Sequence, residues 1–93
     1  MRYISLPPLM QGFVPYGMPL QGQLGTIDLL MEEYESVRLV DHEDMKQEDA
    51  AEHMGISRPT FTRIYDRARK IIAKALVEGK TLQIHGGHCL SHV

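Results

Sequence analysis

Prolines and glycines are concentrated at the start of this 93-residue chain, and they limit what it can fold into. Four of the five prolines and four of the eight glycines lie in residues 1–25. Because proline lacks a backbone donor and glycine adds backbone freedom, this stretch cannot form a long helix. It is nevertheless rich in apolar side chains, and Arg2 is its only charged residue. We therefore expect residues 1–25 to form an extended apolar arm, with a short strand near residues 2–6, that packs on its own domain or on a partner subunit.

Residues 26–44 change from an alternating to a helical pattern. Residues 26–29 alternate polar and apolar side chains, which suits either a short strand or the first turn of the next helix. Between residues 31 and 44 the spacing predicts one face of a helix, formed by Leu30, Tyr34, Val37 and Val40. We expect the carboxylates at positions 32, 33, 35, 41, 43 and 44 to form the solvated face of that helix.

A second, short helix is predicted over roughly residues 46–54, with Ala50, Ala51 and Met54 facing inward. Gly55 follows it directly. Glycine is the residue typical of the left-handed turn after a helix, so we expect the helix to end there.

The third predicted helix is the longest. Ser57 can cap it, and Pro59 falls in its first turn, where a missing N–H costs little. Gly79 is its expected stop. Its apolar stripe consists of Phe61, Ile64, Ala68, Ile71, Ile72, Ala75 and Leu76. Residues 80–85 alternate again and predict a strand. The expected fold is thus a mostly α, three-helix domain over residues 26–80, between the arm and a short strand with a loose tail over residues 81–93.

Residues 47–64 follow the pattern of a DNA-binding helix-turn-helix, in which a short helix, a tight turn and a second helix succeed one another. Ala51 supplies a small side chain where the two helices must cross closely. Gly55, four positions later, supplies the turn. Phe61 and Ile64 anchor the second helix on the first. An ordinary helical hairpin with a glycine turn is the competing interpretation.

The net charge of −2 conceals an uneven distribution. Residues 58–74 contain six basic residues and one acidic residue, hence +5, whereas residues 26–53 contain ten acidic and two basic residues, hence −8. A charged helix face is most often only solvated, but this one coincides with the helix that would meet phosphates. The expected DNA contacts are Ser57, Arg58, Thr60, Thr62, Arg63 and Asp66 near base edges, and Arg67, Arg69, Lys70 and Lys74 near phosphates.

Two resemblances accompany this pattern. The run from Gly55-Ile56-Ser57-Arg58 to Arg67-Ala68-Arg69-Lys70 resembles the C-terminal promoter-reading region of bacterial sigma factors. The whole chain more closely resembles the uncharacterised prokaryotic family called domain of unknown function 134, predicted DNA-binding proteins, and this resemblance implies transcription regulation. The matching segments include Pro15-x-Gly17-x-Pro19-Leu20, Glu33-Tyr34-Glu35-Ser36-Val37-Arg38-Leu39, Gln47-Glu48-Asp49-Ala50-Ala51 and Ser57-Arg58-Pro59-Thr60-Phe61. The chain departs from the family in having only Arg2 in place of a basic N-terminal run, and Pro59 where a polar residue is more common.

The end of the chain gathers three of the five histidines and the only cysteine. His85, His88, Cys89 and His92 are of the types that bind zinc. Adjacent His88 and Cys89 cannot easily both reach one ion, and no upstream CxxC accompanies them. We therefore expect a loose tail, with a metal- or redox-responsive DNA binder as an alternative.

The remaining expectations concern partners and location. No residues assemble a catalytic site, so we expect neither an enzyme nor a cofactor. The chain lacks both the apolar core of a signal peptide and a membrane span of roughly 20 residues, which predicts a cytoplasmic protein. We expect double-stranded DNA as partner and a homodimer, because small domains are marginally stable and symmetric regulators read paired half-sites. The alternative is a protein-interaction module that binds the transcription machinery through its acidic face.

Overall fold

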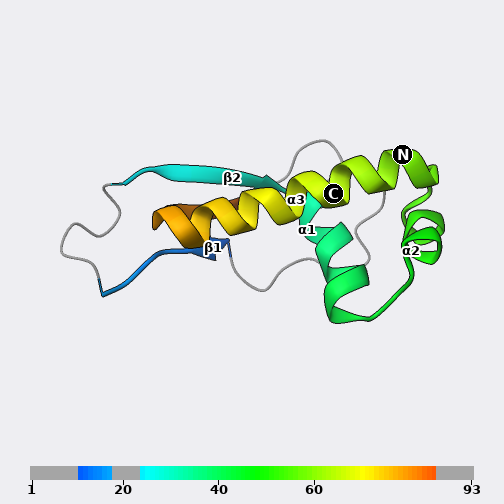
Figure 1. The fold of residues 1–93 in the computed structure, drawn as a ribbon, viewed down its shortest axis with the longest axis horizontal. Coiled ribbons are helices and arrows are strands. Elements are labelled where there is room, and N and C mark those ends of the chain that lie inside the picture. The colour runs from blue at the N-terminus through cyan, green and yellow to red at the C-terminus, as the bar shows by residue number, and fades with distance from the viewer. Residues whose placement is uncertain (1–10, 18–23, 86–93) are drawn as a thin grey trace.

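The computed structural model describes residues 11–17 and 24–85 of the chain (Figure 1). The elements in chain order are β1 (Gly12–Phe13), β2 (Thr26–Leu30), α1 (Met31–Val37), a π-helical turn η1 (Arg38–His42), α2 (Gln47–Met54), α3 (Arg58–Glu78) and β3 (Thr81–His85). This is the mostly helical, three-helix domain with short strands that the sequence predicted. The strand expected near residues 2–6 and the tail after residue 85 lie outside the described residues.

A three-stranded sheet connects β1 of the arm with β2, which precedes the helices, and β3, which follows them. Its order is β1-β3-β2, so the last of the three described strands lies in the middle. β3 pairs antiparallel with β1, where Phe13 lies opposite Leu82. It pairs in parallel with β2, from Thr26 opposite Thr81 to Leu30 opposite His85. Residues 26–29, whose pattern fitted strand or helix, are therefore a strand, and the strand predicted over residues 80–85 is confirmed.

The long helix α3 contributes to two hydrophobic clusters. It begins next to α2, runs past α1 and ends alongside the sheet (Figure 1). One cluster lies between the sheet and the C-terminal half of α3, and consists of Leu29, Ala68, Ile71, Ala75, Leu82 and Ile84. The other lies among η1, α2 and the N-terminal half of α3, and consists of Leu39, Ala50, Ala51, Met54, Phe61 and Tyr65. Because α3 is packed in both clusters, its two ends are held in one orientation.

One residue of the predicted apolar stripe is not in the core. Leu76 is 78% exposed, so the apolar stripe is wider at this point than the part of α3 that the core covers. Successive residues of a helix are turned by about 100° from one another. Ala75 packs against the sheet. The Leu76 side chain is turned away from it by this angle, and so lies beyond the area that the sheet covers.

The helix predicted over residues 31–44 differs from expectation in two ways. It ends as an α-helix at Val37 and continues as the π-helical η1 to His42. Glu33 and Glu35 are 2% and 0% exposed, so their assignment to a solvated face was wrong. Buried carboxylates require partners, and here each has an arginine. The Arg67 side chain binds Glu33, and that of Arg38 binds Glu35.

Candidate nucleic-acid interface

The connection between α2 and α3 is a glycine turn with the conformation that the sequence predicted. Gly55 has a φ of 72° and lies in the left-handed region. Its N–H donates to the Glu52 carbonyl at 3.0 Å, and the Ile56 N–H donates to the Ala51 carbonyl at 3.0 Å. These two bonds satisfy carbonyls that the end of α2 would otherwise leave unpaired. The turn therefore sets the direction in which α3 leaves α2.

Side chains from α2 and from α3 fix the N-terminal end of α3. Ser57 caps the helix as predicted, accepting a 3.3 Å hydrogen bond from the Thr60 N–H. The Thr62 hydroxyl donates to the Gln47 Oε1 at 3.1 Å and so links α3 to the start of α2. Below them, the rings of Phe61 and Tyr65 stack at 5.8 Å between centroids.

The structure separates the predicted packing residues from the exposed ones. Ala51 and Phe61 are buried where α2 meets α3, and Ile64 is half-buried. At the start of α3, Ser57, Arg58 and Arg63 are exposed. Thr60 and Thr62 are half-buried and hydrogen-bonded within the protein, which leaves them less available to a ligand than the sequence suggested.

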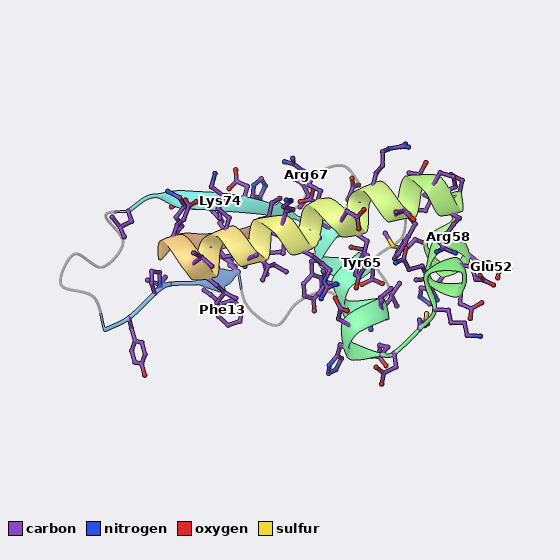
Figure 2. All side chains as sticks on the ribbon, viewed as in Figure 1. Phe13, Glu52, Arg58, Tyr65, Arg67 and Lys74 are labelled. Carbon is purple, nitrogen blue, oxygen red and sulfur yellow. The ribbon has the colours of Figure 1, made fainter. Side chains whose placement is uncertain are left out.

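Four cations lie along one outer face of α3, and we call Arg63, Arg67, Lys70 and Lys74 the basic stripe. Their spacings of four, three and four residues place them on one side of a helix. All four are exposed, and two of them are labelled in Figure 2. From the first to the last the stripe covers roughly 16 Å of helix at 1.5 Å per residue. Asp66 is exposed beside it and is the one acidic side chain of residues 58–74.

Some of the predicted DNA-binding cations are already paired within the protein. Arg58 lies 3.6 Å from Glu48, and Arg67 Nε donates to Glu33 Oε2 at 2.7 Å. Arg69 lies 3.5 Å from Asp41, and its guanidinium lies over the Tyr65 ring at 5.4 Å. In contrast, Arg63, Lys70 and Lys74 form no ion pair within residues 11–17 and 24–85. The basic stripe therefore retains most of its charge for an outside ligand.

Two partly buried polar contacts fix η1, one by joining it to α3 and the other by joining it to α1. The Tyr65 hydroxyl donates to Asp41 Oδ1 at 2.7 Å. Burial, and then this hydrogen bond, raises the pKa of the Tyr65 phenol above its ordinary value. Arg38 donates from Nε and Nη2 to the two oxygens of Glu35, both at 2.9 Å, and this pairing raises its pKa. Sequence reasoning missed the Tyr65–Asp41 contact because its two residues lie 24 positions apart and meet only after folding. The Glu35–Arg38 pair has the i,i+3 spacing of neighbours on a helix, so the sequence did carry a signal for it.

The candidate metal ligands are only partly covered by the described residues. His85 is exposed, and its Nε2 lies 3.3 Å from Asp28 Oδ1 on the neighbouring strand. His88, Cys89 and His92 lie outside the described residues. Among residues 11–17 and 24–85, no three histidine, cysteine or carboxylate side chains gather as a metal site would require.

Together these features define a class of small helical domain, in which one long helix carries a basic stripe and a three-stranded sheet packs on its C-terminal half. The chain belongs to the family described as "Protein of unknown function DUF134", whose model matches residues 1–92. In the described part of the chain, no helix has the length and apolar character needed to cross a bilayer.

Relatives named UPF0251 proteins are similar over nearly the whole chain. The protein from Chloroherpeton thalassium is 45% identical over 87 residues, which are 94% of this chain and 57% of the relative. Those from Moorella thermoacetica and Desulforudis audaxviator are 44% and 46% identical over the same share of this chain, and it covers 58% and 56% of their lengths. This chain thus spans a little under three-fifths of these relatives. No solved structure matches it.

Proposed function

We propose that this chain is a DNA-binding transcriptional regulator, in which α2, the Gly55 turn and α3 act as a helix-turn-helix. The observation that carries the proposal is the basic stripe, which starts in the first turns of α3, next to the turn that positions this helix. A helix whose N-terminal half has one exposed face can enter the major groove of B-DNA, which is about 12 Å wide.

The distribution of charge supports one orientation on DNA. Residues 26–53 have a net charge of −8, and apart from the buried Glu33 and Glu35 their carboxylates are at least partly exposed, so this surface would be repelled by phosphates. On α3, three exposed cations have no ion pair within the described residues: Arg63, Lys70 and Lys74. Phosphates that contact this face would therefore be neutralised and would release counterions, which favours binding of duplex DNA here. The overall charge of −2 then disfavours binding in any other orientation.

The members of the stripe are expected to have different roles. Arg63 is exposed near the start of α3, and the fork of arginine matches the edge of guanine, so we assign it to base contact. Lys70 and Lys74 lie farther along and are assigned to phosphates. Arg67 uses its Nε on Glu33, which leaves its two terminal nitrogens for a phosphate.

The first experiment measures affinity for duplex DNA by fluorescence anisotropy over a series of salt concentrations. Each phosphate contact contributes about −0.9 to the slope of log K against log salt. Lys70→Ala and Lys74→Ala are each expected to make the slope shallower by about 0.9. Lys80→Gln, which removes a cation beyond the C-terminal end of α3, is the matched control and is expected to leave the slope unchanged.

The second experiment selects bound fragments from random duplex DNA and sequences them. The wild-type chain should enrich one motif, Arg63→Ala should relax that preference, and Arg67→Ala should weaken all sequences about equally. If affinity and preference survive Arg63→Ala unchanged, the assignment of base contacts is wrong. If no motif is enriched even at low salt, the acidic α1–α2 surface becomes the better candidate, as a site for a protein partner.

A further inference from the structure

A largely apolar hollow of about 490 Å³ lies between the arm and the C-terminal half of α3. Phe13, Val14 and Tyr16 of the arm and Leu76 of α3 contribute to its walls. Leu82 of β3 and Tyr34 of α1 also line it. Strand β1 holds the arm in this position by pairing with β3.

The walls of the hollow include three large apolar side chains that are mostly exposed. Phe13 is 60% exposed, Tyr16 is 86% exposed, and Leu76 is 78% exposed. At about 200 Å² per aromatic side chain, the two rings alone leave on the order of 300 Å² uncovered. The largest apolar patch of a soluble monomer is of this size and is often functional.

The exposed walls favour a macromolecular occupant over a small molecule. A bound small molecule is usually enclosed by its site, which covers 70–90% of its surface or more. A ligand inside this hollow would leave the outer faces of Tyr16 and Leu76 in water, because these side chains stand at its edge. A second protein surface covers the hollow and its walls together.

We propose that this face binds a second copy of the chain. Lys80 is the one charged residue that lines the hollow within the described part of the chain, and its Nζ lies 3.8 Å from Glu78 Oε1. Two identical copies can therefore meet here without like-charge repulsion, as a twofold interface requires. The basic stripe and the acidic surface of residues 26–53 would each repel their own copy.

The available area matches what a dimer needs. A standard interface covers about 800 Å² of each partner, a little over half of it apolar, which amounts to about 450 Å². The two rings, together with Val14 and Leu76, provide an apolar area of that order. This inference concerns association without DNA and does not depend on the proposed function.

The experiment measures the molar mass of the whole chain, without DNA, by sedimentation over a range of concentrations. The wild-type chain should pass from monomer to dimer as concentration rises. Leu76→Glu should raise the dimer dissociation constant about 30-fold or more, which corresponds to losing one apolar contact that the interface buries.

The matched control is Val77→Glu, which makes the same change of charge one residue away. Val77 is 85% exposed but lines a different hollow, together with Ile27 and Asp28 of β2. This variant should leave the dissociation constant within about threefold, a difference of less than 1 kcal/mol.

Tyr16→Ser tests the same face without altering α3. It therefore separates loss of the contact surface from any disturbance of the helix caused by Leu76→Glu. It should also weaken the dimer. A wild-type chain that stays monomeric at every concentration overturns the proposal, and so do equal effects of Leu76→Glu and Val77→Glu. Circular dichroism establishes that each variant is folded.

Discussion

Arg67 Nε donates a 2.7 Å hydrogen bond to Glu33 Oε2, and this contact joins α3 to α1 across 34 positions of sequence. The other oxygen of Glu33 accepts the Leu30 N–H at 2.9 Å. One buried carboxylate therefore closes the first turn of α1 and holds the middle of the basic stripe. Arg67 has a structural task in addition to its proposed contact with phosphate, which makes it a less clean probe of DNA binding than Lys70.

A double-mutant cycle in urea unfolding measures this contact. Glu33→Gln, Arg67→Ala and the double variant should give a coupling free energy of about 1 kcal/mol. We expect more than for a surface pair because Glu33 is buried, and less than for a buried pair because Arg67 is two-thirds exposed. The matched cycle of Glu33→Gln with Lys70→Ala should give no coupling. Additive effects of Glu33→Gln and Arg67→Ala would contradict the expectation.

The turn between α2 and α3 should be sensitive to a side chain at its glycine. Gly55 has a φ of 72°, and the left-handed conformation costs roughly 1–2 kcal/mol for a residue with a Cβ. Gly55→Ala should lower the free energy of unfolding by that amount in urea titration. Gly55→Asn should cost less, because asparagine tolerates this region. Equal losses in the two variants would show that the backbone angle is not the cause.

The raised pKa of Tyr65 makes stability depend on alkaline pH. The folded phenol holds its proton more tightly than the unfolded one, so its contribution is complete below the unfolded pKa of about 10. It is lost as the pH rises from there through the folded pKa. Tyr65→Phe loses the hydrogen bond to Asp41, at a cost of about 1 kcal/mol at neutral pH. Urea titrations at rising pH should give a steeper loss for wild type than for Tyr65→Phe, and parallel curves would exclude Tyr65 as the source.

The arm should detach from the sheet when Gly12 acquires a side chain. A Cβ at Gly12 would collide with the Leu82 carbonyl oxygen of β3. Next to it, the Ile84 N–H donates to the Gln11 carbonyl at 2.8 Å. Gly12→Ala should therefore speed hydrogen exchange at the Ile84 amide, whereas Gln11→Ala, which alters an exposed side chain, should not. Unchanged exchange in Gly12→Ala would mean that β1 adapts without separating from β3.

Local signals in the sequence were sufficient for the helices around the turn. Gly55, Ser57 and Gly79 each act through their own backbone conformation or a bond to a near neighbour, so their types alone predicted the ends of α2 and α3. The chemistry around α1 could not be predicted in this way. Glu33 has the appearance of a surface residue until Arg67 and the body of the protein fold over it.

The candidate site also has a part that the sequence predicts and a part that depends on contacts with distant residues. The basic stripe follows from helical spacing and was predictable from the sequence. Which of the cations are already paired depends on α1, α2 and η1, through Glu33, Glu48 and Asp41. The exposure of Leu76 depends on where the sheet ends, and a helical pattern carries no information about the width of a sheet.

The position of β3 in the middle of the sheet has a consequence during synthesis of the chain. β2 pairs in parallel with β3, and Thr26 lies 55 positions before its partner Thr81. The ribosome therefore completes α3 before the strand that covers its apolar side has emerged. Until then Ala68, Ile71 and Ala75 lack the cover that Leu82 and Ile84 provide. The nascent domain would thus depend on β3, the last of its described strands to be made, to bury that side of α3.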